Sequence, residues 1–302
     1  MLFLGNADIE ALGLTMRDVV EIVSATLCDK AKGDVELPPK LGLAPRPGAV
    51  LHAMPARVGA AFGMKWIASF PENRARGVPP TTGVIVLNDA ETGAPSAVLD
   101  ADWITTMRTG AVAAVAARML ARPDSPSAAI IGPGRIGASA LAALRLTLPP
   151  RTVRAWAPNP ETARRFAHAN EADVARSAEE AIRGADIIVS AAPWPGGPPR
   201  IEAEWIAPGA FACALDYDAS FTRDAVARFD EAVTDDVPQM EIARAKGAFR
   251  NWPRFSELCT AHRKLPDQRI VCAALGLALF DVAVATRVVR VARERGIGRE
   301  LT

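Results

Sequence analysis

The chain has 302 residues, of which 50% are hydrophobic and 23% are charged. This length allows two ordinary domains, each with its own core, and the composition excludes a disordered or fibrous protein. Lysine and arginine total 35 and aspartate and glutamate total 34, so the net charge is +1, which removes the usual electrostatic argument for a nucleic-acid-binding protein. No apolar run approaches the length that crosses a bilayer, and residues 1–10 lack the basic-then-apolar order of a secretory signal. We expect a two-domain cytoplasmic protein with neither nucleic acid nor a membrane as a partner.

Cysteine and histidine are too few and too scattered to predict a metal site. The chain has three histidines and four cysteines, with no CxxC pair. We therefore expect buried, reduced thiols and no bound metal. The cysteines are Cys28, Cys213, Cys259 and Cys272.

The first hundred residues predict an α+β domain with a mixed or antiparallel sheet. Residues 16–28 have the pattern of an amphipathic helix. Glycine, proline and Asn-Asp turns then separate several short β-like runs. These runs are 49–52, 63–70, 83–87 and 97–99.

An alanine-rich helix and a proline-rich break follow. Residues 109–121 are rich in alanine with interleaved valine, methionine and leucine, which predicts a helix. A helix cannot continue through residues 122–126, which read RPDSP. We therefore expect a domain boundary near Arg122.

Beyond this break, strands and helices alternate, which predicts a right-handed parallel sheet. Asn159 and Pro160 are suited to the N-cap and first position of one helix. The last segment, 270–295, predicts one long apolar helix that can pack back on the first domain. The expected strands are 128–131, 152–156, 185–191 and 210–215, and the expected helices are 160–169 and 177–183.

The clearest motif is a glycine-rich turn after the predicted strand at 128–131. Residues 132–137 read GPGRIG, which fits G-x-G-x-x-G at the start of a helical segment. In this pattern Gly132 permits a tight turn, Gly134 lets the backbone approach a pyrophosphate, and Gly137 permits close packing of helix on strand. The motif predicts dinucleotide binding. The alternative is a structural turn in a Rossmann-like sheet that has lost its nucleotide.

The choice between NAD and NADP stays open. NAD is typically held by a carboxylate at the end of the second strand, but residues 156–159 read WAPN and contain no acid. This absence favours NADP mildly, yet no arginine stands at the turn, because Arg164 and Arg165 lie further along the helix.

Two cations in the first domain are candidate ligands of an anion. Lys65 lies among small and apolar residues, where a charge costs free energy unless it is paired, so we expect an anionic partner or a lowered pKa. Arg108 stands at the start of the predicted helix 109–121, where a guanidinium can bind a carboxylate through two hydrogen bonds. The alternatives are an edge-strand lysine and a helix-start arginine that both point to solvent.

Taken together, the motifs resemble the ornithine cyclodeaminase/μ-crystallin family over residues 38–279. They are, in chain order, Gly63-Met64-Lys65, Pro71-Glu72-Asn73, the turn at 87–93, Arg108-Thr109, the glycine motif and the segment at 276–281. The resemblance implies an α/β fold and a homodimer. It implies a substrate-binding and dimerisation domain of α+β type at 1–121 and 271–302, and a Rossmann nucleotide domain at 122–270.

The resemblance also implies roles for individual residues. Lys65 and Arg108 match the family's ligands of the substrate carboxylate, and Lys40 falls where many members have an arginine with that role. Asp216, directly after the predicted strand 210–215, matches the catalytic aspartate, and Asp218 is a close rival. The residues expected to contact the cofactor are Thr109, Gly132, Gly134, Arg135, Ile136, Gly137 and Asn159.

The predicted function is that of an NAD(P)-dependent imine reductase or amino-acid dehydrogenase acting on the Cα–N bond. Lys40, Lys65 and Arg108 would hold the substrate carboxylate and polarise the imine, and Asp216 would donate or accept a proton. The residues expected to be catalytic are Lys65 and Asp216. One alternative is a cyclodeaminase that releases ammonia, although residues 215–220 differ from the Pro-Gly-Lys segment of ornithine cyclodeaminases. The other is a crystallin-like protein that binds NADPH and a small ligand without turnover.

Overall fold

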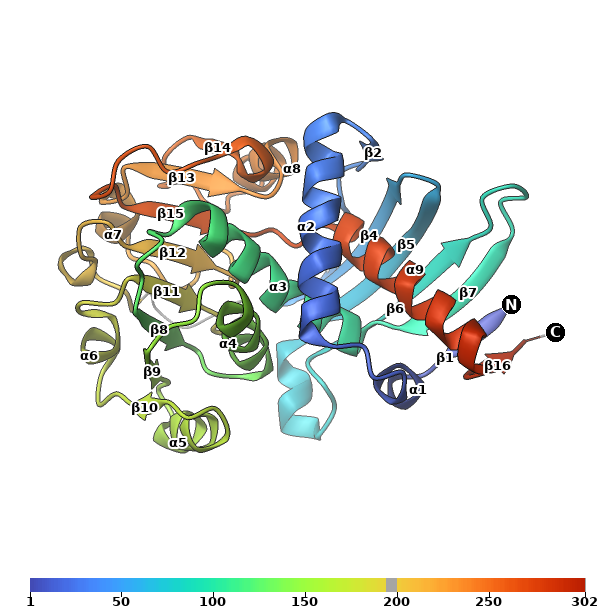
Figure 1. Cartoon of the computed structure of the whole chain (residues 1–302), viewed down its shortest axis with the longest axis horizontal. Helices are drawn as coiled ribbons and strands as arrows, with labels where there is room; N and C mark the ends of the chain where they lie inside the picture. The colour runs from blue at the N-terminus through green and yellow to red at the C-terminus, as the bar shows by residue number, and fades with distance from the viewer. Residues whose placement is uncertain (194–199, 302) are drawn as a thin grey trace. The chain divides into compact units, whose positions relative to one another are not determined.

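Two β-sheets form the framework, and each belongs to a separate unit of the chain (Figure 1). This computed structural model describes residues 1–193 and 200–301, and within them each sheet has eight strands. One unit comprises Met1–Arg108 and Leu277–Thr302, and the other comprises Thr109–Gly276. Among the described residues, no helix is both long enough and apolar enough to span a bilayer.

The first unit contains a mixed sheet, as its short β-like runs predict. Its strand order is β16-β1-β7-β6-β5-β4-β2, and β3 also pairs with β4. β1 and β7 are parallel, whereas β4, β5, β6 and β7 form antiparallel neighbours. The strands are β1 (Leu2–Leu4), β2 (Val35–Glu36), β3 (Leu41–Arg46), β4 (Ala49–Val58), β5 (Ala61–Ser69), β6 (Thr81–Asn88), β7 (Pro95–Asp100) and β16 (Arg299–Glu300).

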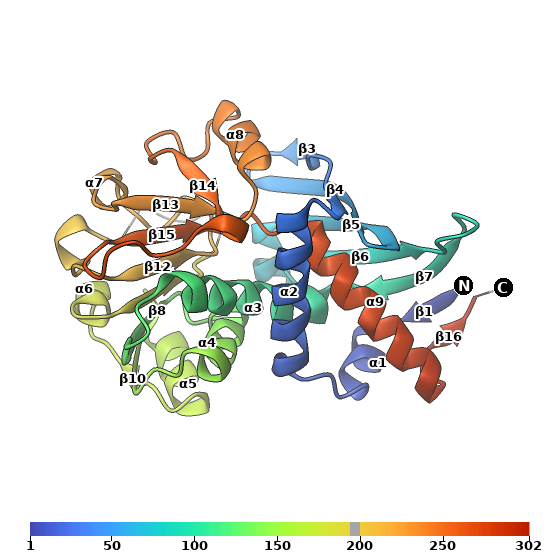
Figure 2. The same cartoon turned by 45° about the horizontal axis from the view of Figure 1, so that its top comes forward.

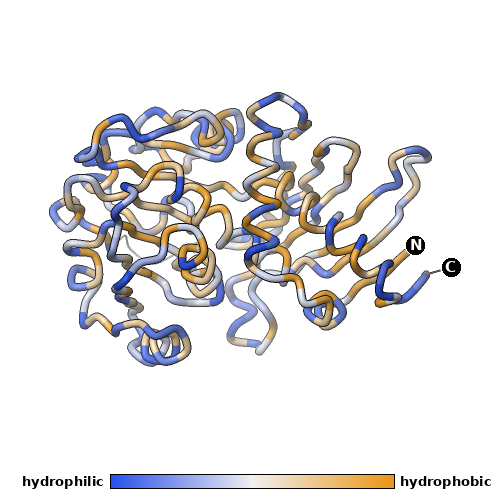
Figure 3. The backbone as a smooth tube through the Cα atoms, viewed as in Figure 1, coloured by the Kyte–Doolittle hydropathy of each residue, from blue (hydrophilic) through white to orange (hydrophobic). Residues whose placement is uncertain are grey.

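Two long helices lie on one face of this sheet. α9 packs against β4, β5 and β6, and α2 packs against α9 (Figures 1 and 2). Thr15 caps α2 by accepting a hydrogen bond from Asp18 N, and Gly33 ends it in the left-handed conformation. Figure 3 shows hydrophobic and hydrophilic residues alternating along α9 and a hydrophilic tip on the β6–β7 hairpin. The helical elements are α1 (Asn6–Ala11), α2 (Met16–Lys32), the 3₁₀ turn η1 (Pro71–Arg76), α9 (Ala278–Arg295) and the start of α3 (Asp102–Leu120).

The helix-covered face of this sheet is the buried one. Met54, Lys65, Ile85 and Leu99 pair in register across β4, β5, β6 and β7, and all four are buried. Since register partners in an antiparallel sheet share a face, Lys65 lies in an apolar row beneath α9.

The second unit contains a parallel sheet whose first five strands follow the Rossmann order. Its strand order is β10-β9-β8-β11-β12-β15-β13-β14, and every described pair is parallel. From β8 the chain first adds strands on one side and then, with β11, on the other. Such a switch point is where doubly wound sheets bind ligands, at the carboxyl ends of the strands. The strands are β8 (Ser127–Ile131), β9 (Thr152–Trp156), β10 (Asp173–Val174), β11 (Ile187–Ser190), β12 (Phe211–Ala214), β13 (Glu231–Thr234), β14 (Phe255–Glu257) and β15 (Ile270–Ala273).

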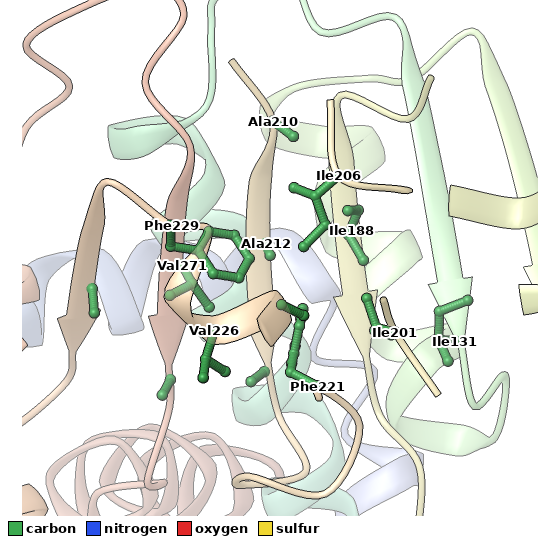
Figure 4. Packing of buried hydrophobic residues seen from close by; sticks show 14 of the residues in the cluster. Ile131, Ile188, Ile201, Ile206, Ala210, Ala212, Phe221, Val226, Phe229 and Val271 are labelled. Carbon is green, nitrogen blue, oxygen red and sulfur yellow. The ribbon is translucent and has the colours of Figure 1, made fainter. Parts of the chain in front are cut away.

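Helices cover this sheet, and small apolar side chains fill its core. One buried cluster joins Ile131, Ile188, Phe221, Val226 and Val271 (Figure 4). Asn159 caps α5 by accepting a hydrogen bond from Glu161 N, as predicted. The remaining helical elements are α4 (Arg135–Thr147), α5 (Pro160–Ala169), α6 (Ala178–Ile182), α7 (Arg223–Ala227), α8 (Val237–Ala245) and the 3₁₀ turns η2 (Ala203–Trp205) and η3 (Leu258–Thr260).

The prediction of one continuous helix over 270–295 is wrong. Ile270–Ala273 is β15, which lies between β12 and β13, and α9 begins only at Ala278. Gly276, with φ of +74°, separates the two elements. An apolar run that is buried on both faces has no periodicity that distinguishes a strand from a helix.

Two smaller expectations also need correction. Cys213 and Cys272 are buried, but Cys28 is exposed and Cys259 is partly exposed. α3 begins at Asp102, so Arg108 lies in its second turn rather than at the start of a helix. The threonines at 105 and 106 lower the helix propensity of this first stretch, and tertiary packing outweighs that preference.

Candidate functional site

The glycine motif forms a strand–turn–helix junction between β8 and α4, as predicted. Gly132 has φ of +79°, and a Cβ on it would lie 2.6 Å from Ala192 N, just beyond β11. A Cβ on Gly137 would lie 3.0 Å from Ile130 Cγ2, which shows how closely α4 packs on β8. A Cβ on Gly134 would meet nothing within 4 Å. Gly132 thus makes the turn tight, Gly137 lets the helix pack closely on the strand, and Gly134 leaves open space. A pyrophosphate-binding turn needs these three properties at these three positions.

The start of α4 is suited to bind an anion. Its N-cap is Gly134, and no side chain caps the helix. No cap therefore competes with a phosphate for the N–H groups of the first turn, and the helix dipole favours negative charge there. Arg135 is exposed and Ile136 is partly buried in that turn. The glycine turn and the uncapped first turn of α4 are therefore suited to bind the pyrophosphate of a dinucleotide.

The end of β9 would face the adenosine ribose in this fold. The Asn159 side chain is occupied as the N-cap of α5, because it accepts a hydrogen bond from Glu161 N at 3.0 Å. The guanidinium carbon of Arg200 lies 5.6 Å from the centre of the Trp156 ring. A cation thus stands at the end of β9, where NAD enzymes place an acid.

Thr109 lies in α3, next to a close helix contact. A Cβ on the neighbouring Gly110 would lie 2.2 Å from Ser139 Oγ of α4. Only a glycine at position 110 lets α3 and α4 approach so closely. This contact holds Thr109 close to the helix that follows the glycine turn.

Asp216 follows β12 and is held by hydrogen bonds to both carboxylate oxygens. Oδ1 accepts from Ser190 Oγ at 2.8 Å, and Oδ2 accepts from Ala192 N at 2.9 Å and from Ser220 Oγ at 2.6 Å. Burial raises the pKa of Asp216, and the hydrogen bonds from Ser220 and Ser190 oppose that rise. The carboxylate therefore lies at the carboxyl end of β11, next to the backbone that contacts Gly132. Ser190 and Ser220 were not among the candidate residues, because no motif distinguishes them from other serines.

The rival Asp218 has a backbone partner of its own. Its Oδ2 accepts a hydrogen bond from Phe249 N at 2.9 Å. Between the two aspartates, Tyr217 has φ of +59°, a conformation that costs free energy for a residue with a side chain. Such backbone strain is concentrated in functional loops, which supports a functional role for residues 216–218.

In the first unit, Lys65 is fully buried and bonded to an acid. Its Nζ donates to Asp281 Oδ1 at 2.8 Å, and its side chain is 1% exposed. Burial lowers the pKa of Lys65 to about 7; the charge of Asp281 opposes this shift, and the charge of Arg108 adds to it. Both expectations for this residue, an anionic partner and a lowered pKa, are confirmed.

Arg108 bonds to the same carboxylate oxygen. Its Nε donates to Asp281 Oδ1 at 3.0 Å, and its side chain is 8% exposed. Burial alone would raise the pKa of Asp281, but the charges of Arg108 and Lys65 outweigh that effect and lower it. Asp281 was not among the candidate residues. The signal for it is an acid in the apolar first turn of α9.

Lys40 is partly buried and precedes β3. It is close enough to Lys65 for its charge to contribute to lowering the pKa of that residue. The first unit thus brings together the three predicted cations and one acid that was not predicted. Asp216 and the glycine turn belong to the second unit. Among the described residues, no group of three or more histidine, cysteine or acidic side chains could hold a metal ion.

The chain is similar over nearly its whole length to a known family and to known proteins. Residues 2–296 match the model of the Ornithine cyclodeaminase/mu-crystallin family. The alanine dehydrogenase of Archaeoglobus fulgidus is 30% identical over 319 residues, which cover 99% of this chain and 98% of that protein.

Two solved structures resemble the whole chain. The Delta(1)-pyrroline-2-carboxylate reductase of Thermococcus litoralis, in complex with NADH and L-proline, is 26% identical with a TM-score of 0.89, and 100% of each chain is covered. An archaeal alanine dehydrogenase dimer with bound NAD is 28% identical with a TM-score of 0.90, and 100% of this chain and 99% of that chain are covered.

Proposed function

The chain belongs to the ornithine cyclodeaminase/mu-crystallin family, and we propose that it is an NAD(P)-dependent oxidoreductase acting on the Cα–N bond of an amino or imino acid. As an imine reductase or amino-acid dehydrogenase, it would resemble the relatives named as alanine dehydrogenase and pyrroline-2-carboxylate reductase. The cyclodeaminase reaction is the second candidate, because the family's own name includes it. We also propose a cytoplasmic location, where nicotinamide dinucleotides are available.

One observation carries the proposal: two buried cations share a single carboxylate oxygen. Lys65 and Arg108 together bring two positive charges to one negative charge on Asp281. Unbalanced charge in a buried site costs free energy unless an anion joins it. A substrate carboxylate supplies that charge, and Lys40 adds a third cation nearby. We assign these three cations to the substrate carboxylate.

We assign the cofactor to the second unit. Gly132, Gly134 and Gly137 would cradle the pyrophosphate at the start of α4, and Arg135, Ile136, Thr109 and Asn159 would lie around it. When bound, the nicotinamide supplies or accepts a hydride. The chain has an arginine at the end of β9 and no acid there, so both NAD and NADP are kept as candidates.

The proton steps fall to Asp216 and Lys65. A buried carboxyl group with a raised pKa holds a proton closer to neutral pH, which suits it to exchange a proton with the substrate nitrogen. Ser190 and Ser220 hold that carboxyl group in place. Lys65, with a pKa of about 7, is charged for only part of the time at neutral pH, so it can polarise an imine through its charge and also release a proton.

We propose a homodimer formed through the uncovered face of the first unit's sheet. The register partners Leu41, Ala53, Trp66 and Val84 run across β3, β4, β5 and β6 on the face opposite Lys65. Leu41 is 72% exposed, and Trp66 and Val84 are partly exposed. An apolar sheet face of this kind favours a partner surface, and a second copy fits because the archaeal alanine dehydrogenase is described as a dimer.

The test is a cofactor-turnover assay on the purified protein. Imino acids, formed from keto acids with amines or supplied as cyclic imines, are offered with NADH and with NADPH, and nicotinamide absorbance is followed. We expect stoichiometric oxidation of one of the two cofactors. Ammonia release from a diamino acid with only catalytic NAD would favour a cyclodeaminase instead. Tight cofactor binding without conversion of any amino or imino acid would favour a crystallin-like binding protein and refute the proposal.

A further inference from the structure

Asp281 connects distant parts of the first unit at one atom. Its carboxylate is fully buried in the first turn of α9. Oδ1 accepts from Lys65 Nζ, 216 residues earlier in the chain, and from Arg108 Nε, 173 residues earlier. Because both bonds end on one oxygen, the two donor nitrogens are at most about 6 Å apart. One small carboxylate can bridge two donors at that spacing.

The bond to Nε also determines which part of Arg108 remains available. A guanidinium is planar and carries five N–H donors in a fixed fork. Asp281 takes the Nε donor, and within the described residues the two terminal nitrogens of Arg108 have no hydrogen-bonding partner. The two terminal nitrogens of the guanidinium, Nη1 and Nη2, are therefore available to bind the carboxylate of a ligand.

The second oxygen of Asp281 argues against a purely structural ion pair. Oδ2 is buried and has no hydrogen-bonding partner among the described residues. A carboxylate that served only to neutralise two buried cations would gain most by placing one on each oxygen. Here both cations are drawn to the same oxygen, at the cost of leaving an acceptor unsatisfied.

We propose that Asp281 is a positioning residue that holds Lys65 and Arg108 at the spacing of one carboxylate and aims the end of the Arg108 fork at a monoanionic substrate. This role rests on the proposed function, because it presumes a substrate carboxylate at these cations. Asp281 itself contacts the cations and not the reacting atoms. When Lys65 is protonated, Lys65 and Arg108 together carry one positive charge more than Asp281 balances, and the carboxylate of a monoanionic substrate supplies the missing negative charge.

The test replaces Asp281 with asparagine, which keeps the shape and removes the charge. Loss of the charge removes an interaction that raises the pKa of Lys65, so Lys65 should titrate at a lower pH. We expect KM for the imino acid to rise by about tenfold or more, because one fewer charged donor binds the carboxylate. We also expect the alkaline limb of kcat/KM to move to lower pH. The control is Glu294→Gln, the same change on an exposed acid of α9, which should leave both quantities unchanged.

Two further measurements separate positioning from folding. Asp281→Glu keeps the charge but displaces it, so its alkaline limb should stay at the wild-type pH while its KM rises. If Asp281→Asn does not fold, as judged by circular dichroism and by binding of NAD(P)H, Asp281→Glu supplies the test. A folded Asp281→Glu variant with the wild-type KM would then overturn the role.

A measurement that does not depend on catalytic turnover distinguishes this role of Asp281 from the proposed function. The pKa of Lys65 can be measured by carbon-13 NMR of labelled lysine side chains, with Lys65→Met assigning the signal. If the wild type converts no substrate, the proposed function fails, but a lower titration midpoint in Asp281→Asn still supports the part of the role that needs no substrate, which is the control of Lys65 by Asp281. An active wild type whose Asp281→Asn variant keeps the same KM and the same Lys65 midpoint would overturn the role alone.

Discussion

Raising the pH through the pKa of Lys65 should lower activity and raise stability at the same time. Burial brings this pKa from 10.5 to about 7, a difference of about 3.5 units that corresponds to about 5 kcal/mol. If only protonated Lys65 binds the substrate carboxylate, kcat/KM falls about tenfold for each pH unit above 7. The unfolded chain keeps its proton up to about pH 10.5, so it binds more protons than the folded chain between these values. Stability therefore rises with pH in that window, by about 1.4 kcal/mol per unit.

Two variants isolate the contribution of Lys65. Lys65→Arg carries a charge at every relevant pH, so the ratio of wild-type to variant kcat/KM should fall between about pH 7 and 9. Lys65→Met removes the titrating group, so the wild-type free energy of unfolding in urea should rise relative to that variant over the same range. A ratio that stays constant, together with parallel stability curves, would show that Lys65 does not titrate near neutrality and would refute the reasoning.

Three further predictions test other parts of the site. Gly134→Val should weaken NAD(P)H binding by at least about tenfold, measured by fluorescence titration, because its side chain fills the open space that a pyrophosphate needs; unchanged affinity would mean the cofactor binds elsewhere. Asp216→Asn should lower kcat by about a hundredfold or more while cofactor binding persists, whereas Asp218→Asn should keep its kcat; equal kcat values would remove the proton-transfer role. Leu41→Lys should shift the protein toward monomer in sedimentation velocity, while Leu265→Lys, which is 60% exposed in the second unit, should not; a dimer in both would place the interface elsewhere.

The local features of the second unit were predictable because each depends on neighbouring residues. The strand at 127–131, the turn and the helix that follows it lie within about twenty residues, and the φ of Gly132 and the open space at Gly134 agree with their places in the motif. The capping of α5 by Asn159 is equally local. Where a strand is buried on both faces, as at 270–273, this approach fails because hydrophobicity carries no period.

The Lys65 environment shows the limit of single-residue reasoning. A lysine among apolar residues implies a partner or a shifted pKa, and the structure shows both. The identity of the partner was not predictable, since Asp281 is 216 residues away and enters the unit on a helix whose start was assigned wrongly. The hydrogen bonds that hold Asp216 were missed for the same reason, because Ser190 comes from the neighbouring strand β11.

The return of the chain to its first unit after residue 276 has an electrostatic consequence. The buried cations Lys65 and Arg108 both belong to residues 1–108, and the acid that bonds them comes from the C-terminal segment. Burying two cations without an acid would cost several kcal/mol, so the buried cations of the first unit depend on α9 for the acid that neutralises part of their charge. α9 therefore does more than cover an apolar sheet: it carries the charge that allows a cationic substrate site to exist in the interior of that unit.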